Sequence, residues 1–130
     1  MGLNILLVDD EQDVRQSLSH FLTKLGHRIV AAADAEQALG HFQGQAFDVV
    51  VSDIRMPGMD GLELLQRLRQ SEGGAVEVIL VTGHGDMDNA VKALKLGAFD
   101  YLQKPIDVRE LALGLDRIQE YKTLRNNYSQ

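Results

Sequence analysis

Five short apolar runs alternate with segments of helical spacing along this chain, and this alternation restricts the fold more than any other feature. The runs span residues 5–8, 28–32, 47–52, 76–81 and 99–102. Runs of this length are typical of buried strands, and strands that alternate with helices form βαβ units with a parallel sheet. Right-handed crossovers then place helices on both faces of that sheet. The sequence therefore predicts an α/β fold with a doubly wound, five-stranded parallel sheet of the (βα)5 type.

The segments between these runs carry apolar side chains at helical spacing. The five apolar stripes are Val14, Leu18, Phe21, Leu22 and Leu25; Ala35, Ala38, Leu39 and Phe42; Leu62, Leu65 and Leu68; Ala90, Val91 and Leu94; and Val108, Leu111, Leu115 and Ile118. Steps of three and four residues place such side chains on one side of a helix, facing a core. We therefore expect five amphipathic helices packed against the sheet.

Size and composition exclude several classes of protein. The chain has 130 residues, no cysteine and a formal net charge of −6. This length suits one domain, and the lack of cysteine excludes disulfides and thiolate metal sites. The negative charge disfavours direct binding to nucleic-acid phosphates. The start, MGLNILLVDDEQ, lacks the basic region of a signal peptide, and no apolar stretch approaches the length of a membrane span. We expect a cytoplasmic protein without a membrane partner.

Polar side chains follow four of the apolar runs, at the point where each strand ends. Asp9 and Asp10 follow the first run, Asp53 the third, Thr82 the fourth and Lys104 the fifth. In an open α/β sheet these ends share one edge, and ligands bind in the crevice beyond it. Three converging carboxylates repel one another unless a cation lies among them. An all-oxygen set suits a hard cation such as Mg²⁺, or Mn²⁺ in its place.

A lysine and a hydroxyl beside such a cation indicate an anion, and a phosphoryl group fits. Each residue alone also has a plain structural explanation. Asp53 could be a turn residue or helix cap, Asp9 and Asp10 could favour the start of the first helix, Thr82 could be an ordinary strand residue, and Lys104 could be a solvated surface lysine. Their joint placement at successive strand ends favours the functional interpretation.

Four motifs, LLVDDE, VVSDIRMPGMDG, ILVTGHGD and AFDYLQKP, occur here in that order. Together they resemble the receiver domain of two-component response regulators, with its CheY-like, flavodoxin-like fold, over residues 5–118. The resemblance implies that Asp53 accepts a phosphoryl group from a phosphohistidine on a histidine kinase or phosphotransfer protein. It also implies that Asp10 binds the metal directly, that Asp9 binds it mostly through water, and that the backbone carbonyl of Arg55 is a further ligand.

The resemblance assigns further roles near the site. Thr82 and Lys104 would contact the phosphoryl oxygens, Thr82 and Tyr101 would act as the switch, and the Lys104–Pro105 peptide bond would be cis. Two positions that vary within the family and tune phosphoryl lifetime carry Arg55 and His84 in this chain. Both are bulky and polar, and neither breaks the pattern of the family. The sequence therefore does not predict the rate of dephosphorylation.

The stretch TGHGDMDNAVKALKLGAFDYLQKP is most similar to the receivers of NtrC-like regulators, which implies an output on transcription. The alternative is a stand-alone or hybrid-kinase receiver that controls partner proteins or an effector enzyme that does not bind DNA. We assign residues 1–121 to the receiver domain. Residues 122–130 form a helical tail, which is either a polar terminus or the start of a linker to an effector domain that this chain does not contain.

We also hypothesise a homodimer that forms on phosphorylation, through the face shared by the fourth helix, the fifth strand and the fifth helix. Charged side chains of both signs in this region could pair across a two-fold axis. The alternative is a monomer whose same face binds another domain. The two readings differ in the partner and agree on the face.

The sequence argues against three competing functions. A phosphohydrolase with an aspartate nucleophile usually has an acid two residues later, where this chain has Arg55. A nucleotide-binding domain needs a glycine-rich loop after the first strand, where this chain has DDEQDV. A module that binds partners without phosphorylation would not need the complete polar set. We therefore expect a signalling switch that catalyses only its own phosphorylation and dephosphorylation.

Overall fold

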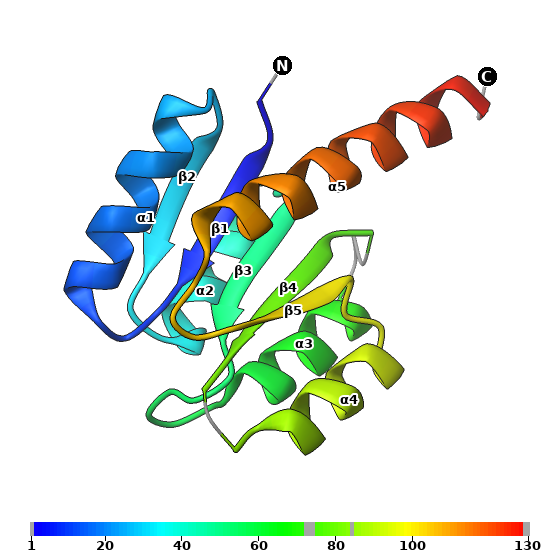
Figure 1. Ribbon diagram of the computed structural model, residues 1–130. Coiled ribbons are helices and arrows are strands. Elements are labelled where there is room, and N and C mark those ends of the chain that lie inside the picture. Colours follow the sequence, from blue (N-terminus) through cyan, green and yellow to red (C-terminus); the bar gives the residue numbers. More distant parts are fainter. Residues whose placement is uncertain (1, 72–74, 84, 129–130) are drawn as a thin grey trace.

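The computed structural model describes residues 2–71, 75–83 and 85–128. Strands and helices alternate in the order β1 (Asn4–Val8), α1 (Gln12–Lys24), β2 (Arg28–Ala32), α2 (Ala35–Gly44), β3 (Val49–Asp53), α3 (Gly61–Gln70), β4 (Glu77–Thr82), α4 (Met87–Lys95), β5 (Asp100–Gln103) and α5 (Val108–Tyr128). The strands form one parallel sheet in the order β2-β1-β3-β4-β5 (Figure 1). The predicted doubly wound (βα)5 fold is confirmed.

The alternation of side chains along each strand divides the core into two layers. In β1, Ile5 and Leu7 join the layer covered by α1 and α5, whereas Leu6 and Val8 join the layer covered by α2, α3 and α4. All four side chains are at most 1 % exposed. Successive residues of a strand point to opposite faces, so a central strand buried on both sides must be apolar throughout. This explains the uninterrupted apolar runs of the sequence.

The register of the sheet brings the polar strand ends to one edge. Val8 of β1 pairs with Ser52 of β3, and Asp53 pairs with Val81 of β4. The acids that follow β1 and the acid that ends β3 are therefore neighbours across two hydrogen-bonded strands. Thr82 lies beside Gln103 at the same edge.

Gly61 holds the loop after β3 close to the strand that it leaves. The Gly61 N–H donates to the carbonyl of Ile54 at 2.8 Å. A Cβ atom at position 61 would lie 2.6 Å from the Asp53 carbonyl oxygen and 2.8 Å from Ile54 Cα. Only glycine permits this approach, because the obstructing atoms are backbone and cannot rotate away. The loop that carries Arg55 is therefore fixed against the end of β3.

The apolar stripe predicted for the fourth helix is wrong in part. The structure buries Ala90 and Ala93 of α4, whereas Val91 is 45 % and Leu94 43 % exposed. Two small alanines bring this short helix close to the core and leave its larger apolar side chains on the outer side, together with Met87. Leu25, which ends the first predicted stripe, is also exposed, because it follows the last residue of α1.

Helix α5 continues without a break past the predicted boundary between residues 121 and 122 (Figure 1). Among the side chains of α5 that the structure describes, Ile118 is the last fully buried apolar one, while Tyr121 and Leu124 are exposed. Lys122 Nζ lies 3.8 Å from Asp48 Oδ1, just before β3, so the first residue of the assigned tail still contacts the domain. Within the described residues, none of the helices combines the length and the apolar character that crossing a membrane requires.

Candidate functional site

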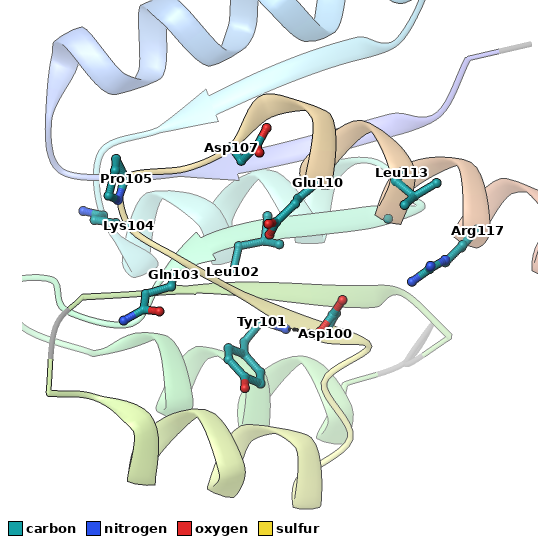
Figure 2. Close-up of a pocket in the computed structure, with 11 residues that line it drawn as sticks. Asp100, Tyr101, Leu102, Gln103, Lys104, Pro105, Asp107, Glu110, Leu113 and Arg117 are labelled. Atoms are coloured by element: carbon teal, nitrogen blue, oxygen red, sulfur yellow. Dashed lines mark hydrogen bonds between the residues drawn. The ribbon is translucent and has the colours of Figure 1, made fainter.

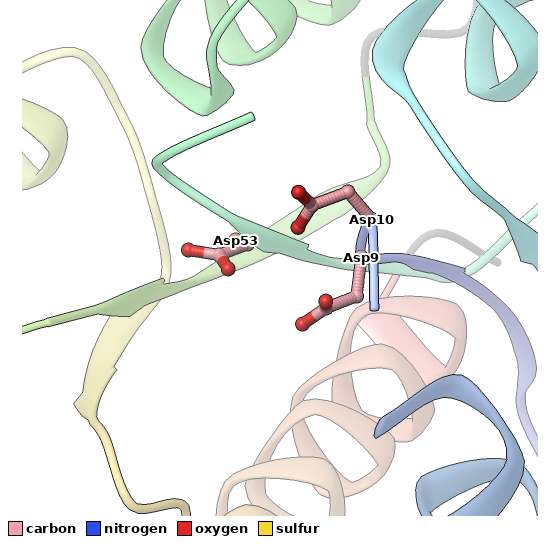
Figure 3. Close-up of side chains that lie close together, drawn as sticks. All are labelled: Asp9, Asp10 and Asp53. Carbon is pink, nitrogen blue, oxygen red and sulfur yellow. The ribbon is translucent and has the colours of Figure 1, made fainter. Parts of the chain in front are cut away.

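Three carboxylates converge at the carboxyl edge of the sheet. One oxygen atom from each of Asp9, Asp10 and Asp53 can be chosen so that all three lie within 4.8 Å of one another (Figure 3). Asp9 is 3 % and Asp53 4 % exposed, whereas Asp10 is exposed to solvent. The strands position them: Asp9 and Asp10 follow β1, and Asp53 is the last residue of β3. The predicted acidic cluster is therefore assembled, with one side open to solvent.

The charges in this cluster oppose one another. Burial raises the pKa of the Asp9 carboxyl above its ordinary value, and the nearby carboxylates of Asp53 and Asp10 raise it further. A hydrogen bond from the Glu11 N–H at 2.8 Å and the charge of Lys104 act in the opposite direction but do not cancel the shift. A set of oxygen ligands that carries excess negative charge fits a hard divalent cation such as Mg²⁺.

Lys104 supplies the positive charge on the other side of Asp53. Its Nζ atom lies 2.6 Å from Asp53 Oδ2, and its side chain is 31 % exposed against 5 % for that of Asp53. Burial acts to lower the pKa of Lys104, but the hydrogen bond and the charge of Asp53 outweigh it, so the pKa is raised. The peptide bond between Lys104 and Pro105 is cis, as the resemblance implied. A fixed cation thus faces the carboxylate at the end of β3.

The two residues expected to act as the switch lie beside this edge on neighbouring strands. Thr82 is 3 % exposed, and its hydroxyl donates to the carbonyl of Leu102 at 3.4 Å. Tyr101 is half-buried, and its hydroxyl donates to Met87 Sδ on α4 at 3.6 Å. Figure 2 shows the Tyr101 ring directed toward α4. In this arrangement both hydroxyls have partners other than the acidic cluster.

Arg55 joins the site to α4 through a partner that the sequence did not indicate. Its backbone N–H donates to Asp53 Oδ1 at 3.2 Å. Its guanidinium reaches Asp86, the residue that precedes α4, with contacts of 2.6 Å from Nη2 to Oδ1 and of 3.1 and 3.2 Å from Nε to the two carboxylate oxygens. The hydrogen bond from Arg55 lowers the pKa of Asp86, and the same bond raises the pKa of Arg55.

Asp86 is easily missed in the sequence because acids are common near helix N-termini. Its burial is the distinguishing sign, since its side chain is 4 % exposed while that of Arg55 is 74 % exposed. A buried carboxylate needs a partner, and here the partner stands 31 residues earlier in the chain. His84, the other predicted lifetime-tuning residue, lies outside the described residues.

Comparison with known families places this chain. The model of the response regulator receiver domain matches residues 5–116. Among curated proteins, the transcriptional regulatory protein FixJ of Bradyrhizobium diazoefficiens is 41 % identical over 104 residues, which cover 80 % of this chain and 50 % of FixJ. The DNA-binding transcriptional regulator NtrC of Klebsiella pneumoniae is 40 % identical over 124 residues, which cover 92 % of this chain and 26 % of NtrC.

Solved structures give the same answer. A response regulator receiver domain protein from Clostridium thermocellum superimposes with a TM-score of 0.89 at 33 % identity, over 94 % of this chain and 98 % of that one. NtrX from Brucella abortus superimposes with a TM-score of 0.90 at 34 % identity, over 99 % of this chain but only 30 % of NtrX. The chain thus spans half or less of these longer regulators and all but a little of a single receiver. It belongs to the receiver-domain family of two-component response regulators.

Proposed function

We propose that Asp53 is the phospho-acceptor of a signalling switch. The observation that carries the proposal is the position of Asp53 between two other carboxylates and the Lys104 ammonium, 2.6 Å away. A carboxylate oxygen of Asp53 attacks the phosphorus of a phosphohistidine, so that a P–O bond forms as the P–N bond breaks. The leaving imidazole keeps the electron pair and takes up a proton from solvent. Water later attacks the same phosphorus, the P–O bond to Asp53 breaks, and inorganic phosphate leaves with the carboxylate regenerated. The chain then catalyses only its own phosphorylation and dephosphorylation.

Mg²⁺ or Mn²⁺ would be held by the carboxylates of Asp10 and Asp53, by Asp9 mostly through water, and by the backbone carbonyl of Arg55, and would neutralise charge on the transferring phosphoryl group. The Lys104 ammonium binds the Asp53 carboxylate in the unphosphorylated chain. After phosphorylation it would bind a phosphoryl oxygen instead. The donor set, its burial and its excess charge support this assignment.

Phosphorylation is then relayed by Thr82 and Tyr101. A phosphoryl group brings new acceptor oxygens and negative charge to the edge of β3. Thr82 has one long hydrogen bond of 3.4 Å to exchange for a charge-assisted one. Its displacement leaves space beside β4 that the ring of Tyr101 can enter, which removes the contact of Tyr101 with Met87 on α4. We assign the tuning of phosphoryl lifetime to Arg55 and His84.

The donor is a histidine kinase or a phosphotransfer protein, and the phosphoryl transfer takes place in the cytoplasm. A cleft of about 680 Å³ opens between α1 and the segment that follows β5, next to Lys104. Its apolar lining consists of Val14, Leu18, Pro105, Ile106 and Val108. A partner that brings a phosphohistidine to Asp53 can bury apolar side chains in this cleft, because the cleft begins at the residue that contacts the acceptor.

The output face comprises α4, β5 and α5. It exposes Met87, Val91 and Leu94 on α4 and Leu113 on α5. Between β5 and α5 lies a pocket of about 650 Å³ with charges of both signs, among them Asp100, Glu110 and Arg117 (Figure 2). We propose that phosphorylation favours a homodimer through this face, which controls transcription through an effector domain beyond this chain. A monomeric receiver whose same face binds that domain, or a separate partner or effector enzyme, is the alternative.

Acetyl phosphate and Mg²⁺ test the acceptor directly. Intact-mass measurement should show one phosphoryl group per chain, and peptide mapping should place it on Asp53. Asp53→Asn should take up none, because the amide has the same shape but is a poor nucleophile. Full labelling of that variant, or labelling of another residue in the unaltered chain, would refute the assignment. Sedimentation with and without beryllofluoride, a phosphoryl mimic, then separates the dimer from the monomer.

A further inference from the structure

The carboxylate of Asp86 occupies an unusual position for a residue at the start of a helix. Asp86 is the N-cap residue of α4, a place where an aspartate ordinarily accepts a hydrogen bond from a backbone N–H of the first turn. Asp34 and Asp60 do so at α2 and α3, accepting from Gln37 and Glu63 at 2.8 and 2.9 Å. Asp86 accepts no backbone N–H of the first turn; its carboxylate is directed to Arg55 and also accepts a long 3.4 Å bond from the Asn89 side chain. The first turn of α4 therefore lacks the cap that its own sequence could supply.

Arg55 connects that uncapped helix to the acceptor. Its backbone N–H is bound to Asp53 Oδ1, so its side chain starts one hydrogen bond from the carboxylate that would be phosphorylated. The Arg55 side chain is 74 % exposed, and within the described residues the hydrogen bonds of its guanidinium all go to Asp86. A phosphoryl group on Asp53 would offer it a dianionic, three-oxygen acceptor, against the single charge of Asp86. The two anions compete for one arginine.

The other end of α4 is held by a different arginine, whose Nη2 also lies 3.9 Å from Glu77 Oε1. Arg69 of α3 donates from Nη1 to the carbonyl of Val76 at 2.6 Å and from Nη2 to the carbonyl of Gly97 at 2.8 Å. These acceptors are backbone groups at the opposite edge of the sheet from Asp53. The two ends of α4 are thus fixed by different arginines, and only Arg55 is placed to respond to charge on the acceptor.

We propose that phosphorylation of Asp53 breaks the Arg55–Asp86 ion pair. The Arg55 guanidinium then binds the phosphoryl oxygens. The released Asp86 carboxylate accepts a backbone N–H of the first turn and so caps α4. Asp86 is then a positioning residue that sets how strongly the acceptor holds its phosphoryl group, acting through Arg55. The inference rests on the proposed function and adds to it a second route from the site to α4, independent of Thr82 and Tyr101. Because breaking the pair opposes phosphoryl binding, removing the charge of Asp86 while keeping Arg55 should strengthen that binding.

A double-mutant cycle with beryllofluoride and Mg²⁺ tests the competition, with the bound complex followed by fluorine NMR. Asp86→Asn keeps the shape of the side chain and removes its charge, so beryllofluoride should bind about fivefold more tightly or better, at the lower end of coupling between linked sites. In an Arg55→Ala background the same change should have no more effect than the loss of a negative charge alone, because there is no pair to break. Asp88→Asn, an exposed acid of the same helix, is the control for loss of charge alone and should change affinity equally in both backgrounds.

Capping is measured separately, by the hydrogen-exchange protection of the backbone N–H of Asn89, the third residue of α4. Beryllofluoride should raise that protection in the unaltered chain and should fail to do so in Asp86→Ala, which cannot cap. If Asp86→Asn changes beryllofluoride affinity equally with and without Arg55, the competition is excluded, even when acetyl phosphate labels Asp53 normally. If acetyl phosphate does not label Asp53 at all, the proposed function fails and this inference fails with it.

Discussion

The two sides of the acceptor strand β3 hold their polar groups in different ways. Toward β1, the carboxylate of Asp9 accepts the Glu11 N–H at 2.8 Å, and its own backbone N–H donates to Ala32 at 3.1 Å. Toward β4 and α4, the hydroxyl of Thr82 has one bond of 3.4 Å, and Arg55 holds Asp86 with an exposed side chain. The first side fixes charges in place through backbone hydrogen bonds. The second side relies on long or exposed side-chain contacts, which can be exchanged.

Helices α3 and α4, which pack side by side on one face of the sheet, also differ in what they bury. Helix α3 buries Leu62, Leu64, Leu65 and Leu68, whereas α4 buries only Ala90 and Ala93. Large buried side chains make a displacement costly, because each shift opens a cavity. Alanines permit a sliding contact at lower cost. We infer that α4 can shift against the sheet more readily than α3, which suits α4 to relaying a signal.

Truncation of one large side chain on each helix should give the largest contrast. Leu65→Ala on α3 should lower the free energy of unfolding by about 2–5 kcal/mol, because Leu65 is 0 % exposed and its loss leaves a cavity. Val91→Ala on α4 should change it by less than about 0.5 kcal/mol, as for most exposed sites. Urea denaturation followed by circular dichroism measures both. Equal losses would show that α4 is as firmly packed as α3.

Most of this contrast could not be predicted from the sequence. The apolar pattern marked all five helices and all five strands, because each buries an apolar stripe or run. It placed Val91 and Leu94 in the core, because spacing identifies a stripe but not which of two adjacent stripes faces inward. In the structure Ala90 and Ala93 face inward, since only small side chains fit where α4 approaches the sheet.

The contacts in the functional site also include some that the sequence predicts and some that it does not. Asp9, Asp10 and Asp53 were predictable because strand ends in a parallel sheet share an edge, whatever the loops do. The pairing of Arg55 with Asp86 was not, because it depends on the path of two loops and on the rotamer of a long side chain. Backbone topology fixes the first kind of contact, and only three-dimensional packing fixes the second.

Magnesium should stabilise the fold without any phosphoryl donor if it binds the folded carboxylate cluster, as proposed, and not the unfolded chain. At about ten times the dissociation constant, the expected gain in the free energy of unfolding is about 1.4 kcal/mol. Asp10→Ala should lose most of this gain, whereas Asp13→Asn, an exposed acid in the first turn of α1, should keep it. Thermal unfolding over a magnesium titration provides the measurement. An equal response in the unaltered chain and in Asp10→Ala would place the metal elsewhere.

The free energy of unfolding, measured against pH, should reveal the buried histidine His27, which lies at the edge of the sheet opposite to the acidic cluster. His27 is 8 % exposed, and its Nδ1 accepts the N–H of Leu3 at 3.0 Å. Burial holds the pKa of His27 below its ordinary value of 6.5, although the charge of Asp116 opposes the shift. Below pH 6.5 the unfolded chain therefore takes up a proton that the folded chain refuses, so stability falls as the pH drops toward the folded-state pKa. The slope cannot exceed about 1.4 kcal/mol per pH unit for one proton.

The asparagine variant isolates this contribution. His27→Asn keeps an oxygen that can accept the Leu3 N–H but cannot titrate in this range, so the slope below pH 6.5 should become shallower. His20→Asn, at an exposed position on α1, should leave the slope unchanged. Denaturant midpoints measured at several pH values between 5 and 8 decide the matter, within the range where histidines titrate. A slope that persists in His27→Asn would assign the pH dependence to other groups.

The smallest expected effect concerns the end of α5, where the fixed domain gives way to the projecting helix. Beyond Ile118, Lys122 forms a 3.8 Å ion pair with Asp48 of the domain. The two side chains are 25 % and 33 % exposed. Pairs of this kind contribute about 0.2–1 kcal/mol. Lys122→Gln should therefore lower the free energy of unfolding only slightly, and more than Lys95→Gln, which makes the same change at an exposed position on α4. If the two variants are indistinguishable, the boundary near residue 121 stands and the tail is independent of the sheet. If Lys122→Gln alone also increases amide exchange from residue 119 onward, the pair fixes the direction of α5, and any domain attached to this helix would inherit that direction.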